Sequence, residues 1–174
     1  MRTGDWMQTA GGRAYWPLDP RADEVDIEDI AHALAHQCRY AGHCSRFYSV
    51  AEHSVLVSLV VPRADAMHAL LHDAPEAYCV DVPRAVKRAL GVGYADIEER
   101  NWRAIADRFS LSREMPVSVK LADNEVLLAE KAALMGASPM PWDVPGEPAD
   151  VRVRGLWPIE ARALFLRRFA ELTT

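Results

Sequence analysis

Residues 49–76, with the sequence SVAEHSVLVSLVVPRADAMHALLHDAPE, decide the fold. Ser49 followed by Glu52 is the spacing of a capping box at a helix start, and the valines that follow recur on one apolar stripe until Pro62 ends the helix. A second helix is expected over 63–74, because the next residue is a proline, whose ring collides with the carbonyl one turn earlier. The stretch therefore predicts two consecutive helices that carry histidines.

Helical periodicity also dominates the rest of the chain. Apolar residues recur at helical spacing in four further segments, which are 26–39, 94–109, 117–135 and the residues from 158 onward. Asp81-Val82-Pro83 indicates a cap with proline in the first turn, followed by a short basic helix that ends at Gly91. No segment shows the alternation that is typical of a strand. We therefore expect an all-α fold in a single compact domain of residues 1–174, made of an irregular arm (1–25), a helical core (26–135), and a proline-rich loop with a last helix (136–174).

The composition limits the classes of function. The chain has 174 residues, half of them apolar, which suits one globular domain with a sizeable core. Its formal charge of -5 argues against the broad basic surface that duplex nucleic acid requires. Three cysteines without a C-x-x-C pair fit a reducing compartment, and no run approaches the roughly 18 apolar residues of a membrane span. We expect a cytoplasmic protein that binds neither duplexes nor membranes.

Polar side chains on the expected helices form the candidate site. His53 lies on the apolar stripe of its helix, and the dipeptide His72-Asp73 lies near the end of the next one. Asp123 lies in a later apolar helix, in which Leu121 is expected to face the core. A lone histidine on such a helix is usually a satisfied core residue, but four polar groups facing a core cost about 1 to 3 kcal/mol each unless they share a partner. A metal ion is such a partner.

Four strings in the region 26–135 occur in a characteristic order. They are Ser49-Val50-Ala51-Glu52-His53-Ser54, Leu71-His72-Asp73-Ala74-Pro75-Glu76, Asp81-Val82-Pro83 with Lys87, and Lys120-Leu121-Ala122-Asp123. Together they resemble the HD-domain superfamily of metal-dependent phosphohydrolases, and within it the 5'-deoxynucleotidases. Related deoxynucleoside triphosphate triphosphohydrolases of phages share the same core. This chain differs from the deoxynucleotidases in its longer N-terminal arm and in a shorter interval between His53 and His72.

The resemblance implies a metal ion held by four side chains, those of His53, His72, Asp73 and Asp123. Two imidazoles and two carboxylates without a thiolate suit one divalent transition ion (Mn, Co, Zn or Fe) better than Mg. His68 lies one helical turn before His72, so a second ion that uses His68, His43, His36 or His32 stays open.

The resemblance also implies roles for acidic and basic side chains. Asp81 would align or deprotonate the attacking water, and Glu76 would support proton transfer. The alternatives are a helix N-cap for Asp81 and a solvated side chain for Glu76. Arg39 and Lys87 would contact phosphate. Tyr40 would fill the space of a 2'-hydroxyl, unless it only packs in the core.

The expected substrate is a small-molecule nucleotide. The matching strings favour a deoxynucleoside 5'-monophosphate; the alternative is a deoxynucleoside triphosphate such as dATP, whose larger charge needs further cations. Convergence of Arg84, Arg88 and Lys120 on the metal would favour the triphosphate. Tyr15 and Trp16 are candidates to stack on the base, unless they pack in the core.

Other functions and assemblies stay open from the sequence. Remoter alternatives are a hydrolase of cyclic dinucleotides or alarmones, and a nucleotide sensor without catalytic activity. A homodimer or a higher homo-oligomer also stays open.

Overall fold

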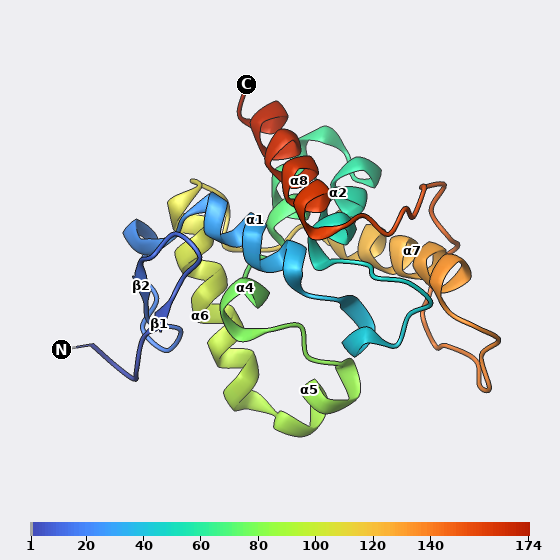
Figure 1. The fold of residues 1–174 in the computed structure, drawn as a ribbon, viewed down its shortest axis with the longest axis horizontal. Coiled ribbons are helices and arrows are strands. Elements are labelled where there is room, and N and C mark those ends of the chain that lie inside the picture. Colours follow the sequence, from blue (N-terminus) through green and yellow to red (C-terminus); the bar gives the residue numbers. More distant parts are fainter. Residues whose placement is uncertain (1) are drawn as a thin grey trace.

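The computed structural model describes residues 2–174, and this part of the chain is all-α apart from one small hairpin (Figure 1). The helices are α1 (Ile27–His36), α2 (Val50–Val60), α3 (Ala66–Leu71), α4 (Glu76–Cys79), α5 (Arg84–Leu90), α6 (Val92–Arg108), α7 (Val117–Leu134) and α8 (Pro158–Thr173). The hairpin joins β1 (Met7–Gln8) to β2 (Ala14–Tyr15), and 3-10 turns cover Ala22–Glu24, Arg39–Gly42 and Arg63–Asp65. Among these helices, none combines the length and the apolar content needed to cross a bilayer. The expected all-α class is confirmed.

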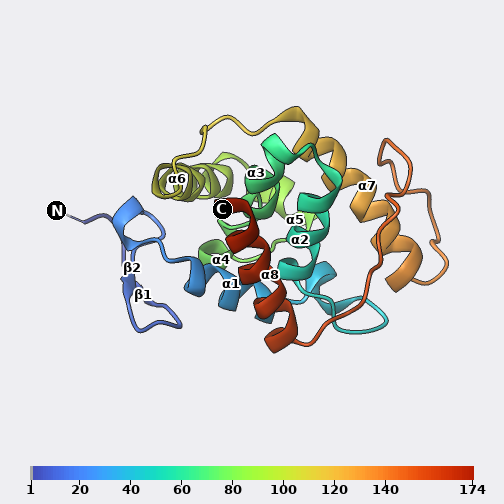
Figure 2. The same cartoon turned by 90° about the horizontal axis from the view of Figure 1, so that it is seen from above.

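Helix α2 lies at the centre of the fold and is buried along most of its length. It packs against α3, α7 and α8, and α8 also lies against α1 (Figure 2). Val55 of α2 belongs to a core cluster with α1, α6 and α8, whereas Val57 belongs to a second cluster with α7. Because apolar neighbours surround α2 on both sides, His53 on this helix is buried completely, at 0% exposure.

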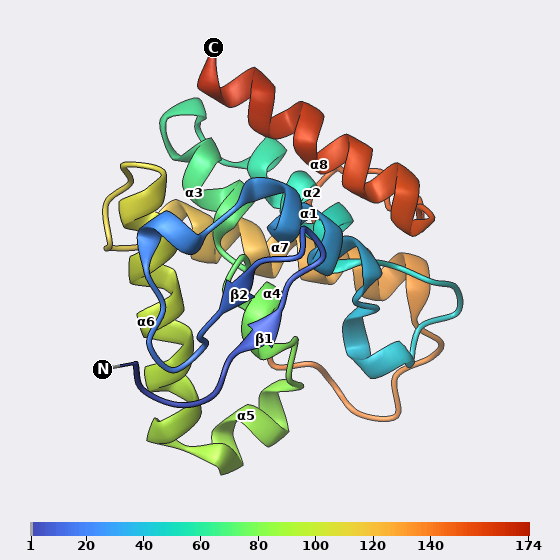
Figure 3. The same cartoon turned by 60° about the vertical axis from the view of Figure 1, so that its left-hand side comes forward.

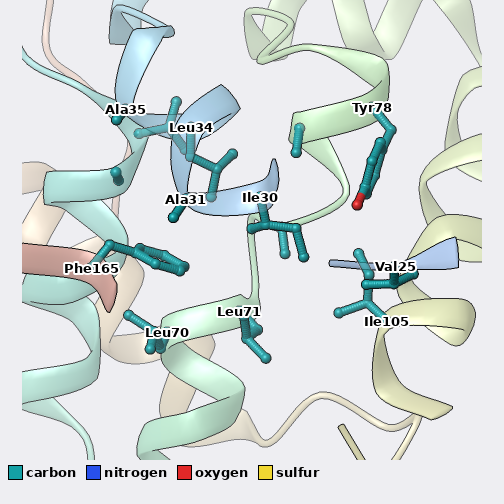
Figure 4. Close-up of a cluster of buried hydrophobic side chains, with 14 of the residues drawn as sticks. Val25, Ile30, Ala31, Leu34, Ala35, Leu70, Leu71, Tyr78, Ile105 and Phe165 are labelled. Carbon is teal, nitrogen blue, oxygen red and sulfur yellow. The ribbon is translucent and has the colours of Figure 1, made fainter. Parts of the chain in front are cut away.

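The larger core cluster joins helices that are far apart in the sequence (Figure 4). Ile30 and Leu34 of α1, Leu70 of α3 and Phe165 of α8 are all fully buried in it. Burial of one such side chain contributes about 1.5 to 3 kcal/mol. The cluster therefore holds the last helix against the first, and Figure 3 shows α8 running past α1 and α2.

Two helix boundaries differ from those expected from the sequence. Helix α1 ends before Arg39, which falls in a 3-10 turn. The helix expected over 63–74 is divided into a 3-10 turn, α3 and, after Pro75, the single turn α4. Pro75 has no N–H to continue α3, but its fixed φ suits the start of a new helix. The division leaves His72 and Asp73 between two helices, near the disruption expected there.

The capping box at the start of α2 is only half formed. The Ser49 hydroxyl accepts a hydrogen bond from the Glu52 backbone N–H at 3.1 Å, as expected. The Glu52 carboxylate does not return to Ser49; it accepts backbone N–H groups from Arg154 (2.7 Å), Gly155 (3.2 Å) and Leu156 (2.7 Å). Glu52 is 1% exposed, so these three bonds satisfy a buried charge and anchor the end of the proline-rich loop.

The N-terminal arm contains the hairpin, which the sequence did not predict because two-residue strands show no measurable alternation. Met7 pairs with Tyr15 across the two antiparallel strands. Tyr15 is fully buried; its hydroxyl donates to Asn101 Oδ1 at 2.7 Å, and its ring stacks on Tyr78 with centroids 3.7 Å apart. The arm therefore packs on α4 and α6.

Candidate metal centre

Three ligand side chains from three parts of the fold converge on one point. His53 comes from α2, His72 follows α3, and Asp123 comes from α7, and their ligand atoms all lie within 4.8 Å of one another. His53 Nε2 is 3.3 Å from Asp123 Oδ1, and the two imidazole centroids are 5.3 Å apart. The sequence placed these residues on separate helices, and the fold brings them together.

The hydrogen bonds of the two imidazoles leave one nitrogen free on each. His53 Nδ1 lies 2.6 Å from Glu130 Oε1, and His72 Nδ1 lies 2.7 Å from the Ala69 carbonyl. Because both partners accept hydrogen bonds, Nδ1 is the donor of each ring, and Nε2 is the atom left to offer a lone pair to a metal ion once it carries no proton. Both Nε2 atoms are buried without a hydrogen-bond partner. Two such orphaned acceptors beside a carboxylate fit a divalent metal ion, and the outer hydrogen bonds are those that orient histidine ligands.

Asp73, the fourth expected ligand, lies beside this group. Its Oδ1 is 3.3 Å from His72 Nε2, and its Oδ2 is 3.6 Å from His53 Nε2. The same Oδ2 is 3.4 Å from Arg39 Nη1. Asp73 thus contacts both imidazoles and shares its charge with Arg39, while the tight group of ligand atoms consists of His53, His72 and Asp123.

The charges around the centre change the proton affinity of its ligands. Burial and Arg39 act to lower the pKa of His53, but Glu130 and Asp123 outweigh them and raise it to about 9. Burial acts to raise the pKa of Asp123, but the nearby imidazoles of His53, whose Nε2 is 3.3 Å from Asp123 Oδ1, and of His72 hold it far below its usual range. Both shifts have the same cause: the carboxylates stabilise a positive charge in the space between His53, His72 and Asp123.

Glu130 lies against the metal group and was not predicted from the sequence. It lies on α7, is 0% exposed, and accepts hydrogen bonds from His53, from the Tyr48 hydroxyl at 2.7 Å and from the Tyr40 hydroxyl. Its Oε2 is also 3.3 Å from Arg39 Nε. Burial acts to raise the pKa of Glu130, but Arg39 and His53 lower it to about 2, so the carboxylate stays charged.

A usable signal for Glu130 existed in the sequence. It lies seven residues after Asp123, so the two carboxylates share one face of α7. Leu121, which was expected to face the core, is 56% exposed; Val126, one turn after Asp123, is fully buried. The inward face of α7 is therefore set by the two carboxylates and their partners, and the expectation for Leu121 was wrong.

The two expected acid/base residues lie beside the metal ligands. Glu76, on α4, is 5% exposed, and Asp81 lies in the connection to α5. Gln37 holds both segments, because its Nε2 donates to the Glu76 carbonyl at 2.9 Å and its Oε1 accepts from the Asp81 N–H at 3.0 Å. Neither structural alternative applies: α5 has Pro83 as its N-cap, without a side-chain hydrogen bond, and Glu76 is not solvated.

Burial changes the proton affinity of both carboxyls. It is the largest cause that raises the pKa of Glu76 well above its usual value, and the charges of Asp73 and Asp81 add to it. Burial also raises the pKa of Asp81, while Arg39 opposes the shift and Asp73 adds to it. A protonated and an ionised carboxyl side by side can divide the work of a general acid and a general base.

A cavity of about 750 Å³ opens over these groups. Its wall includes the expected ligands His72, Asp73 and Asp123, both carboxyls Glu76 and Asp81, and the expected substrate residues Arg39, Tyr40, Arg84, Lys87 and Lys120, together with Arg88 and Trp142. The volume lies within the range of small-molecule binding sites. Apart from the stacking candidates Tyr15 and Trp16, the candidate catalytic and substrate residues that the sequence suggested thus border one space.

The cations around the cavity differ in how far they are already paired. Lys120 Nζ is 3.0 Å and Arg84 Nη2 is 3.6 Å from Asp123 Oδ2. Lys87 Nζ is 2.6 Å from Glu98 Oε1 and 3.8 Å from Glu76 Oε1. Arg84 and Lys120 therefore point toward the metal ligands, whereas Lys87 is held by a carboxylate of α6.

No protein-family model matches this chain. The Escherichia coli protein YfdR is 39% identical over 171 residues, which cover 97% of this chain and 96% of YfdR. This chain belongs to the YfdR family. A Rhodobacter capsulatus protein is 37% identical, over 94% of this chain and 93% of its own length. Both relatives are named as uncharacterized proteins, so the YfdR family defines a shared fold without naming an activity.

The remaining histidines of this YfdR-family chain lie apart from the metal group. His68 Nε2 faces the Ser112 carbonyl at 3.2 Å, and His32 stacks on His36 along α1 with centroids 4.1 Å apart. Within residues 2–174, the group of three or more metal-ligand side chains is the one that contains His53 and His72. His68 is therefore not part of this group.

The aromatic residues of the arm are not at the cavity. Tyr15 is buried in the core, and Trp16 lies under Arg2, whose guanidinium carbon is 4.1 Å from the ring centroid. Besides Tyr40, the cavity is bordered by the aromatic side chain of Trp142, from the proline-rich loop. Its ring lies 6.3 Å from that of Tyr40 and under Lys131 Nζ at 5.1 Å. The packing alternative therefore holds for Tyr15, which lies against Tyr78 of α4 and Asn101 of α6, and neither Tyr15 nor Trp16 borders the cavity.

Proposed function

We propose that this chain is a metal-dependent phosphohydrolase that acts on deoxynucleotides. The observation that carries the proposal is the pair of orphaned Nε2 atoms of His53 and His72, which meet Asp123 at the wall of a cavity bordered by two carboxyls and several cations. A divalent ion bound there would polarise a phosphoryl oxygen and acidify water. The resemblance to HD-domain enzymes supplies the expected reaction.

The protein's own side chains would carry the proton transfers. Asp81, ionised, would accept a proton from the attacking water or orient it by a hydrogen bond. Glu76, whose raised pKa favours the protonated form, would donate a proton to the leaving oxygen. Gln37 positions both groups through its two amide hydrogen bonds. Arg39 is held between Asp73 and Glu130, so its main role would be to orient these carboxylates rather than to grip phosphate freely.

The cations favour a triphosphate over the monophosphate that the sequence suggested. Arg84 and Lys120 both lie within 3.6 Å of Asp123, and Arg88 borders the same cavity. A triphosphate brings about twice the negative charge of a monophosphate and benefits more from such a cluster. A deoxynucleoside triphosphate triphosphohydrolase is therefore the form of the proposal that the charges support best, and the 5'-monophosphatase is the second candidate.

Two aromatic rings would place the nucleoside. Tyr40 lies nearer the metal group, because its hydroxyl binds Glu130, and Trp142 lies beyond it at the cavity wall. A base can stack on Trp142 while the sugar lies against Tyr40, where a 2'-hydroxyl would have little room.

The proposal is tested by product analysis. The purified chain is incubated with Mn²⁺, Co²⁺ or Mg²⁺ and with deoxynucleoside mono- and triphosphates and their ribonucleotide counterparts. Free deoxynucleoside with intact tripolyphosphate supports the triphosphohydrolase, and orthophosphate released only from monophosphates supports the second candidate. Asp123→Asn is the matched inactive variant. No product from any substrate with any metal would contradict the proposal.

A further inference from the structure

Two thiols lie against each other at the edge of the cavity. The Sγ atoms of Cys38 and Cys44 are 3.6 Å apart, both cysteines are free, and both are partly exposed. They flank the 3-10 turn Arg39–Gly42, which carries three residues of the cavity wall, Arg39, Tyr40 and Ala41. The third cysteine, Cys79, lies on α4, where its thiol donates to the Pro75 carbonyl at 3.0 Å.

The turn between the two thiols is a tight reversal whose ends are fixed. Tyr40, Ala41 and Gly42 have φ values of 58°, 50° and 80°, three consecutive residues in the left-handed region. The Arg39 N–H donates to the Tyr48 carbonyl and the Ser45 N–H to the Leu134 carbonyl, each at 2.9 Å. Non-glycine residues adopt this conformation only when the surroundings impose it. Here the anchored ends impose it and bring the cysteines together.

We propose that Cys38 and Cys44 form a reversible disulfide when the protein meets a peroxide. One thiolate attacks a peroxide oxygen and breaks the O–O bond, which leaves a sulfenic acid and one water once the protons are balanced. The other sulfur then attacks the sulfenic sulfur, forms the S–S bond and releases a second water. Two thiols and one hydrogen peroxide give one disulfide and two waters, so sulfur is oxidised and peroxide oxygen is reduced.

The geometry makes this pair the reactive one. The sulfurs must approach from 3.6 Å to about 2.05 Å, a small closure across a turn of five intervening residues. Burial and the neighbouring Cys38 raise the pKa of the Cys44 thiol, so the reaction should speed up as the pH rises. Burial raises the pKa of Cys79 to about 12, which leaves that thiol a poor nucleophile.

The disulfide would also weaken metal binding, an inference that rests on the proposed function. Closing the turn moves Arg39 and Tyr40, both of which contact Glu130, the partner of His53 Nδ1. A disturbed Glu130 orients His53 less well and weakens metal binding. The oxidation state of Cys38 and Cys44 would thereby control how tightly the metal centre binds its ion.

The disulfide is tested by peptide mapping of the full chain. The protein is treated with hydrogen peroxide, its remaining thiols are alkylated, and it is digested with trypsin. Trypsin cuts after Arg39, so the expected product is peptide 22–39 joined to peptide 40–46, while peptide 64–84, with Cys79, stays alkylated. C79S should keep the linked product, and C38S and C44S should lose it. Failure to find it in both the wild type and C79S, or equally frequent links to Cys79, would overturn the proposal.

The link to the metal centre has its own measurement. Mn²⁺ is titrated into the reduced, the oxidised and the dithiothreitol-treated protein, with C38S as the variant that cannot oxidise. A weaker affinity after oxidation that dithiothreitol restores, and that C38S does not show, is expected. Equal Mn²⁺ affinities in the three states would refute the link to the metal centre but not the disulfide. Absence of Mn²⁺ binding in every state would contradict the proposed metal site and not the disulfide.

Discussion

Replacement of Glu130 by Gln tests whether this buried carboxylate organises the metal centre. The amide keeps the shape, and its carbonyl can still accept from His53 and Tyr48. Its NH₂ group, however, faces Arg39 Nε, which now lies 3.3 Å from Oε2. Removing one partner of a buried ion pair costs about 3 to 5 kcal/mol, and since Asp73 remains beside Arg39, we expect the lower end, about 3 kcal/mol.

The effect on the metal should be separate from the effect on stability. Loss of an outer partner of a histidine ligand typically weakens metal binding about 10- to 100-fold. Glu130→Ala is more severe, because it leaves three donors unpaired at about 1 to 3 kcal/mol each in addition to the ion pair, which approaches the whole stability of a domain.

Urea unfolding of the metal-free chain and Mn²⁺ titration measure the two effects. Glu125→Gln is the matched control on the same helix, because within residues 2–174 the Glu125 side chain has no ion pair or hydrogen bond. We expect the control to behave as the wild type. The reasoning is refuted if Glu130→Gln changes the free energy of unfolding by less than about 0.5 kcal/mol and leaves the Mn²⁺ affinity unchanged.

Four further results are expected. Because the pKa of His53 is about 9 without metal, a bound ion must displace the proton of His53 at any pH below 9. The Mn²⁺ affinity should therefore rise about tenfold per pH unit from pH 7 and level off above pH 9. A Mn²⁺ affinity that does not change with pH, measured by calorimetry, would contradict this. Asp81→Asn and Glu76→Gln should retain Mn²⁺ but lower kcat by about two to four decades, and unchanged kcat in both would remove them from the mechanism. Arg39→Ala should raise KM, and because it leaves the carboxylates of Asp73 and Glu130 unpaired, it should also lower the free energy of unfolding by about 3 to 5 kcal/mol. A urea unfolding midpoint equal to that of the wild type would show that Arg39 does not stabilise the fold. Glu52→Ala should lower the free energy of unfolding by about 3 kcal/mol or more and increase proteolysis of the proline-rich loop. A digestion pattern equal to that of the wild type would refute the anchoring role of Glu52.

The sequence predicted the helices well where apolar periodicity is strong and both ends are marked. For α2, Ser49 and Pro62 bracket the apolar stripe, and the structure has the helix at Val50–Val60. The single turn α4 and the hairpin were missed, because four-residue and two-residue elements have too few positions to show a period. They exist because tertiary contacts, such as Tyr15 on Tyr78, hold them.

The site was predictable where the motif residues are themselves the ligands, and not where the polar partners come from elsewhere. His53, His72 and Asp123 converge as the pattern implied. Glu130 was missed because a helix phase drawn from apolar residues alone favoured Leu121, whereas the buried side of α7 is partly ionic. Trp142 was missed because a loop rich in proline carries no period that would say where it folds back.

The hydrogen bonds of Glu52 determine when, during synthesis, α2 can pack into the core. Its carboxylate, one residue before His53, accepts the backbone N–H of Leu156, which is 104 positions later. Until residues 154–156 leave the ribosome, the Glu52 carboxylate of α2 lacks the backbone donors that it has in the folded protein. A nascent chain can therefore contain every ligand string and still be unable to pack the helix that presents His53, so metal loading should come only after residues 154–156 have been made.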